Sequence, residues 1–159
     1  MSSDPIRTQP VRRATLATLI LLLIQFALGT VANLYVTIPA HHPGAHPSNY
    51  FSGSLRSLGW ALHHSALSLA AHSGLGLLLV LAAIGLLVQT RRLQRPRLFA
   101  AAALGALCVI GAGFNGLSFL DDGKNVNSLI MALLFALAML CYLSIMYATP
   151  AGTSAAAGR

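Results

Sequence analysis

Charged side chains are scarce in this chain of 159 residues, and acidic side chains are the scarcest. Charged residues make up 8% of the sequence and hydrophobic residues 56%, and the acidic residues are only Asp4, Asp121 and Asp122. Soluble domains carry about 25% charged residues, because water must solvate their surface. The composition therefore excludes a water-soluble globule and indicates that lipid covers much of the protein surface.

Several chemical groups that enzymes use are also missing. Cys108 and Cys141 form no CxxC pair, which argues against a thiol–disulfide enzyme, and inside apolar runs cysteine usually acts as a packing residue. The sequence contains no GxSxG motif and no glycine-rich phosphate loop. No carboxylate interrupts a long apolar run, so the usual coupling group of a proton-driven exporter is absent. These absences favour a protein that is not an enzyme.

Four uncharged apolar runs are long enough to cross a bilayer, and they cover about residues 14–38, 67–89, 98–120 and 126–147. About 20 helical residues cross a hydrocarbon core of about 30 Å, and only a helix satisfies its own backbone hydrogen bonds there. The first run exceeds the core of a secretory signal, so we expect a retained helix, with a cleaved signal as the alternative. The sequence predicts an all-α, up-down-up-down bundle of four transmembrane helices in one domain.

Basic residues are concentrated before the first run and between the second and third runs: Arg7, Arg12, Arg13, Arg91, Arg92, Arg95 and Arg97. By contrast, residues 39–66 hold only Arg56, and the turn before the fourth run holds only Lys124. The positive-inside rule then places both termini on the cytoplasmic side of the plasma membrane. The net charge of +7 reflects this topology and contacts with lipid headgroups, and it gives no support for nucleic-acid binding.

Two segments outside the four runs have their own character. In the outer loop of residues 39–66, Phe51, Leu55, Leu58 and Leu62 recur at helical spacing, which predicts an interfacial helix or an extension of the second span. The tail of residues 149–159 is small and polar, so we expect it to be disordered and cytoplasmic.

Polar residues in the first three runs recur every three or four positions, so within each run they share one helix face. These faces contain Gln25, Gly29 and Asn33; His64, Ser68, His72 and Gly76; and Gly111, Asn115, Ser118 and Asp122. Such side chains either hydrogen-bond neighbouring helices or bind a ligand. We predict a ligand site in the outer leaflet formed by Gln25, Asn33, His72 and Asn115.

A resemblance to haem proteins rests on two stretches, Gln25-Phe-Ala-Leu-Gly29 and His72-Ser-Gly-Leu-Gly76. They resemble part of one four-helix half of haem A synthase and of small cytochrome b-type bundles, in which a histidine near the outer end of a span ligates haem. The resemblance implies haem b with His72 as an axial ligand. It covers two of the four spans, and the paired histidine expected on the fourth helix is absent. A second ligand would come from His63, His64, a loop histidine, Met131, Met139 or a partner subunit.

Two further patterns carry weaker alternatives. The loop histidines His41, His42 and His46 suit copper, zinc or nickel, and Asp121 and Asp122 would complete such a set of ligands. The first interpretation of both aspartates, however, is that they are turn residues. One side of the fourth run carries a stripe of methionine and aromatic residues, which are Met131, Phe135, Met139, Tyr142 and Met146. Such a stripe is typical of a core or lipid-facing surface, and the alternative is that the edge of a quinone or haem packs against it.

The chain as a whole is similar to small four-helix membrane proteins of bacteria, a resemblance that implies a fold and no activity. The sequence therefore favours a non-enzymatic accessory subunit or small-ligand binding module, embedded in lipid and associated with a membrane protein partner or a second copy of itself. The alternative is a haem-binding protein for electron transfer or haem handling.

Overall fold

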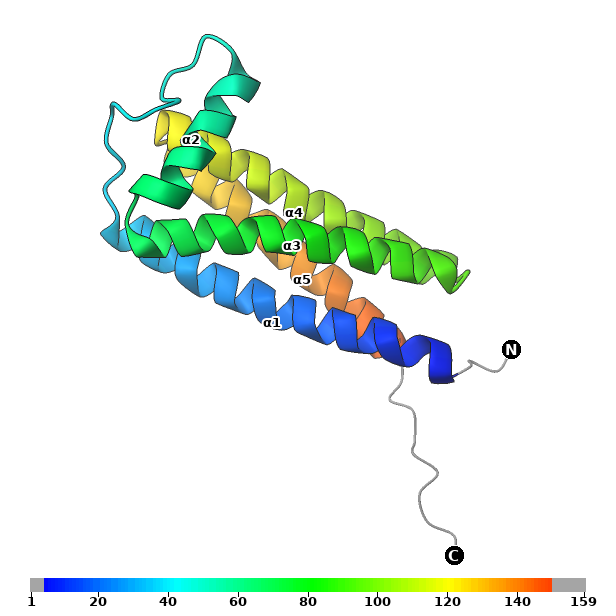
Figure 1. Cartoon of the computed structure of the whole chain (residues 1–159). Coiled ribbons are helices and arrows are strands. Elements are labelled where there is room, and N and C mark those ends of the chain that lie inside the picture. The colour runs from blue at the N-terminus through cyan, green and yellow to red at the C-terminus, as the bar shows by residue number, and fades with distance from the viewer. Residues whose placement is uncertain (1–4, 150–159) are drawn as a thin grey trace, which may run out of the picture.

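The computed structural model describes the backbone of residues 5–149 and the side chains of residues 8–149. It contains five helices, which are α1 (Pro5–Tyr35), α2 (Tyr50–His64), α3 (Leu67–Arg92), α4 (Pro96–Asp122) and α5 (Asn125–Ala148) (Figure 1). The tail that the sequence predicts to be disordered lies, apart from Thr149, outside the described residues.

The four long helices α1, α3, α4 and α5 are each long and apolar enough to cross a membrane. They run in alternating directions beside one another, as Figure 1 shows, which confirms the predicted all-α bundle of four spans. Helix α1 packs on α3 and α5, and α4 packs on the same two helices, so the four spans form a ring.

The end of α1 differs from the predicted end of the first span. The apolar run continues to Ile38, but the helix stops at Tyr35, with a last backbone bond from Val36 N to Ala32 O at 3.0 Å. Pro39 explains the difference, because a proline disfavours the helical conformation in the residue before it. The chain therefore leaves the bundle earlier than hydropathy alone suggests.

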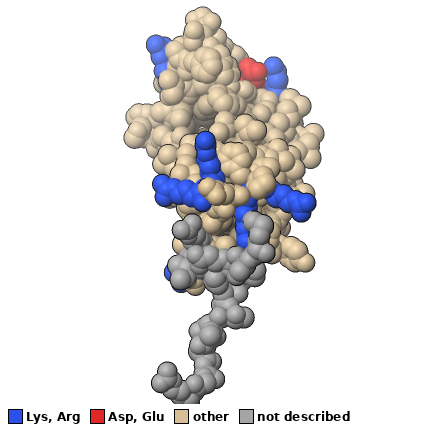
Figure 2. Space-filling view, turned by 90° about the vertical axis from the view of Figure 1, so that its right-hand side faces the viewer, with Lys and Arg blue, Asp and Glu red and all other residues tan. Residues whose placement is uncertain are grey.

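One end of the bundle carries the start of α1, the link between α3 and α4, and the end of α5 (Figure 1). Figure 2 looks onto this end and shows basic side chains spread around it. Arg12 joins two helices here, since its Nη1 donates to the carbonyl oxygens of Met146 and Thr149 at 3.1 and 2.8 Å. A cation at these carbonyls is favourable because the C-terminus of a helix carries partial negative charge.

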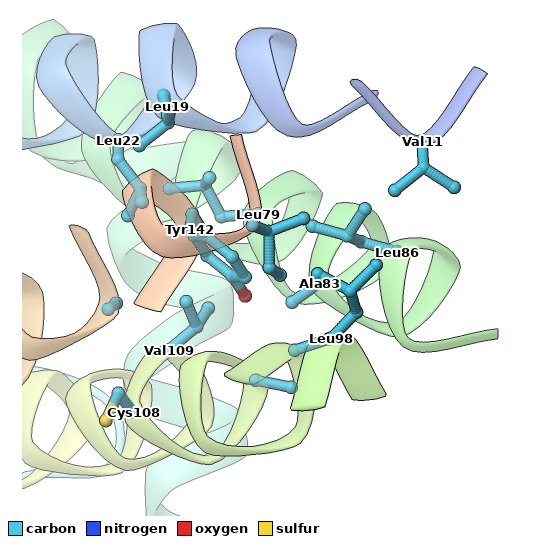
Figure 3. Close-up of a cluster of buried hydrophobic side chains, with 14 residues drawn as sticks. Val11, Leu19, Leu22, Leu79, Ala83, Leu86, Leu98, Cys108, Val109 and Tyr142 are labelled. Atoms are coloured by element: carbon cyan, nitrogen blue, oxygen red, sulfur yellow. The ribbon is translucent and has the colours of Figure 1, made fainter. Parts of the chain in front are cut away.

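The main hydrophobic core fills the half of the bundle nearer this basic end. Tyr142 of α5 is fully buried there and points among side chains of α1, α3 and α4 (Figure 3). Gly105 of α4 makes room for its ring, because a Cβ at that position would lie 2.7 Å from Tyr142 Cε1. Most other large apolar side chains of the spans face outward, as a surface solvated by lipid requires.

Helix α2 crosses the opposite end of the bundle and packs on α3 and α4 (Figure 1). It is a separate helix rather than an extension of α3: Asn49 caps its start by accepting from Ser52 N at 3.1 Å, and Ser65 ends it with extended backbone. Its buried face is made of small residues, whereas Phe51 and Leu55 are each 69% exposed. This exposed apolar face fits a helix that lies at the membrane surface.

Candidate functional site

The polar faces predicted on the first two spans meet at one pair of side chains, Gln25 of α1 and His72 of α3. The imidazole Nδ1 of His72 donates to the backbone carbonyl of Gln25 at 3.2 Å. Its Nε2 lies 3.3 Å from the side-chain nitrogen of Gln25. One histidine therefore contacts both the backbone and the side chain of the same residue across the α1–α3 interface.

These contacts determine the tautomer of His72 and the orientation of the Gln25 amide. A carbonyl only accepts, so Nδ1 carries the hydrogen and Nε2 of the neutral ring presents a lone pair. The nitrogen of the Gln25 amide then donates to that lone pair, because an oxygen there would face another acceptor. The amide oxygen Oε1 is left buried, with no hydrogen-bond partner among the described residues.

Two glycines allow α1 and α3 to approach closely enough for this pair. A Cβ at Gly29, one turn after Gln25, would lie 2.7 Å from Cε1 and 3.1 Å from Nδ1 of His72. A Cβ at Gly76 would lie 3.3 Å from the amide nitrogen of Gln25. The small and the polar residues on the two predicted faces are therefore complementary. Each glycine leaves space for a polar side chain of the other helix.

A cavity of about 560 Å³ opens beside the pair in the half of the bundle away from the arginines. Side chains of all five helices line it, and most of them are apolar. Gln25 and His72 are among the few polar groups in the lining, which also includes Met131 and Phe135 from the predicted α5 stripe. The cavity falls within the size range of about 300–1,000 Å³ that holds small ligands in other proteins.

The other two residues predicted for the site occupy different positions. Asn33 lines the cavity near the end of α1, and its Oδ1 accepts from Ser128 Oγ of α5 at 3.2 Å. Asn115 does not line the cavity: its Nδ2 donates to the carbonyl of Gly111 on its own helix at 2.9 Å. The structure thus brings together Gln25 and His72, places Asn33 near the mouth, and leaves Asn115 outside.

The loop histidines do not gather into a metal centre. Nε2 of His42 donates to the carbonyl of Leu120 at 3.0 Å, and its ring stacks on Trp60 with centroids 4.5 Å apart. His41 and His46 lie exposed in the same loop. Within residues 5–149, no three His, Cys, Asp or Glu side chains lie close enough to hold a metal ion together.

Asp121 was expected to be a turn residue, and the structure gives it a different position. It is 7% exposed under α2, where Ser57 and Ser54 donate to its carboxylate at 2.8 and 3.4 Å. The turn itself is made by Gly123, which has a φ of 64° at the end of α4, and Asp122 pairs with Lys124 at 3.0 Å. No sequence signal identified this contact between α2 and α4.

The aromatic stack between Phe26 and Phe135 was also not apparent from the sequence. The two rings lie at 5.0 Å between centroids and pack across the α1–α5 interface, and both line the cavity. Phe26 belongs to a lipid-facing part of α1, and the spacing of apolar residues cannot indicate which ring of a neighbouring helix it meets.

Comparisons with known proteins give no relative for the chain: no family model matches it, and neither curated proteins nor solved structures contain a match.

Proposed function

We propose that this protein is a non-enzymatic binding module of the plasma membrane that holds a small apolar ligand in its cavity through Gln25 and His72. The observation that carries the proposal is the buried Oε1 of Gln25, which has no partner among the described residues and belongs to a side chain that lines the cavity. A polar atom left unsatisfied in a buried site costs about 1–3 kcal/mol. Because Oε1 is itself covered in the ligand-free protein, a ligand recovers that cost when the Gln25 side chain turns to present this atom to the cavity.

The location of the pair supports a ligand taken from the outer half of the membrane. Gln25 lies about 15 Å along α1 from Tyr35, and His72 lies about 8 Å along α3 from Leu67, at the end opposite the arginines. The positive-inside rule orients the arginine-rich end toward the cytoplasm. With this orientation, α2 lies on the outer surface and both termini are cytoplasmic.

Native mass spectrometry of the protein released from its own membranes tests the proposal. The wild-type protein should carry a small-molecule adduct that is lost in Gln25→Leu and in His72→Leu. Asn115→Leu is the matched control, because it removes a polar side chain of a span that does not line the cavity. Equal adduct occupancy in all four proteins would refute the proposal.

Haem b binding is the second candidate function, and one observation favours it. His72 uses Nδ1 on a backbone carbonyl, which leaves Nε2 as the metal-binding atom, and Met131 lines the same cavity. The fit is incomplete, because the Gln25 amide occupies Nε2 and would have to turn away. If bound, haem would supply one-electron redox chemistry. A Soret band in protein purified from haem-replete cells, lost in His72→Ala, is the expected result, and colourless protein would eliminate this function.

A further inference from the structure

The interface between α1 and α5 differs along its length. At the basic end it is tied by Arg12, which donates to two carbonyl oxygens near the end of α5. At the outer end Ser128 donates to Asn33. Between these polar contacts lies the stack of Phe26 on Phe135, whose rings are 22° from parallel.

This stack forms the part of the cavity wall that lies between α1 and α5. Both rings line the cavity, and Phe26 is 51% exposed. An aromatic pair adds only a small stabilisation beyond its buried area, and rotating one ring breaks no hydrogen bond. The wall can therefore open by a side-chain rotation while the contacts at the two ends of the interface stay in place.

The hydrogen-bonding capacity of the pair limits the polar group of the ligand. Nδ1 of His72 is used on the Gln25 carbonyl, and Nε2 accepts from the Gln25 amide. What remains is the acceptor Oε1 together with the second hydrogen of the amide nitrogen. A hydroxyl group both donates and accepts, so it satisfies both, whereas a ketone or ether leaves Oε1 without a donor.

From these observations, and resting on the function proposed above, we propose that the ligand is a lipid-dissolved molecule with a hydroxyl headgroup, which enters from the outer leaflet between α1 and α5 by displacing the ring of Phe26. The headgroup binds Gln25, and the apolar remainder occupies the part of the cavity lined by Met131 and Phe135. The ligand reaches the site through the membrane and never passes through water.

Two fluorinated probes test the headgroup requirement in protein reconstituted into lipid nanodiscs. The first is 2-fluoro-4-nonylphenol and the second is its methyl ether, in which a methyl group replaces the hydroxyl hydrogen and removes the donor. Fluorine NMR should show the phenol bound about tenfold more tightly than the ether, the factor expected from one satisfied buried acceptor. In Gln25→Leu the two affinities should become equal, whereas Asn115→Leu should keep the difference.

The exchange rate of the bound phenol tests the route. Phe26→Ala removes the wall ring and should raise the rate about two- to tenfold, as expected from the loss of one aromatic contact. Leu23→Ala is the control, because Leu23 is a lipid-facing residue of the same helix that does not line the cavity. An unchanged rate in Phe26→Ala would contradict the route.

The outcomes separate this inference from the function on which it rests. If the ether binds as tightly as the phenol, the hydroxyl assignment is wrong while the binding function stands. If neither probe binds but the native adduct depends on Gln25 and His72, the ligand class is wrong and the site remains. If neither probe binds and the native adduct is missing or independent of these residues, both proposals fail.

Discussion

Ser57 of α2 donates a hydrogen bond of 2.8 Å to the carboxylate of Asp121 on α4, and both residues are buried. Ser54 donates to the other oxygen of the same carboxylate at 3.4 Å. Ser54, Ser57 and Asp121 therefore help to attach α2 to the spans, and the small side chains on the buried face of α2 allow the close approach. Because Leu58 of α2 also lines the cavity, this attachment holds one part of the cavity wall in place.

Replacing Asp121 by Ala should destabilise the protein by about 1–3 kcal/mol, because two buried hydroxyls lose their acceptor. Asp121→Asn keeps an acceptor oxygen and should retain more of the stability. The neighbouring change Asp122→Ala removes an exposed ion pair with Lys124 and should cost less than about 1 kcal/mol. Unfolding of the reconstituted protein by increasing SDS measures all three, and equal effects at the two aspartates would contradict the structure.

Arg12→Met should lower stability by about 1–2 kcal/mol, since it removes the cation that binds two carbonyl oxygens near the end of α5. Arg13→Met makes the same change of charge at the next position, where the side chain is exposed. It should leave stability nearly unchanged. Unfolding midpoints of the two variants provide the comparison, and an equal loss in Arg13→Met would show that net charge matters rather than the cap.

Tyr142→Phe should leave stability unchanged or raise it by up to about 1–3 kcal/mol. The hydroxyl of Tyr142 is buried without a hydrogen-bond partner among the described residues, so its removal relieves an unsatisfied polar group. The ring still fills the space beside Gly105. Gly105→Ala, in contrast, should destabilise by about 1–3 kcal/mol through overpacking. A clear loss of stability in Tyr142→Phe would mean that the hydroxyl has a partner.

Gly29→Ala should weaken binding of the phenol probe at least as much as His72→Leu does, because the added methyl would lie 2.7 Å from the imidazole and displace it from the Gln25 carbonyl. Gly85→Ala on α3 is the control, since nothing lies within 4 Å of a Cβ at that position. Probe affinities measured by fluorine NMR decide the matter. Unchanged affinity in Gly29→Ala would indicate that the ring position is not needed for binding.

The spans could be predicted from the sequence because the signal is additive over many residues. A run of about 20 apolar residues identifies a transmembrane helix whatever its neighbours are, and short connections fix the direction of the next helix. The end of α1 was less predictable, because Val36 and Ile38 are apolar yet lie outside the helix. Hydropathy reports the solvent around a residue and says little about its backbone conformation.

The partners of individual side chains were harder to predict than the faces they occupy. Helical spacing placed Gln25, His72 and Asn115 on polar faces, but an amide can bond across an interface or back to its own helix. The amide of Gln25 bonds across the interface to His72, and the amide of Asn115 bonds to a carbonyl of its own helix. Similarly, the sequence indicated turn residues at Asp121 and Asp122 and placed Asp122 on the polar face of the third run, whereas it is Asp121 that the structure buries under α2.

Nitrogen-15 NMR of histidine-labelled protein in bilayers tests the central claim, the pairing of His72 with Gln25, most directly. The resonances of His72, identified by their loss in His72→Ala, should show a hydrogen on Nδ1 and a hydrogen-bonded lone pair on Nε2. In Gln25→Leu the Nε2 resonance should move while Nδ1 keeps its hydrogen, because the backbone carbonyl at position 25 remains. A hydrogen on Nε2 of the wild-type ring, or an Nε2 resonance that ignores the substitution, would contradict the pairing.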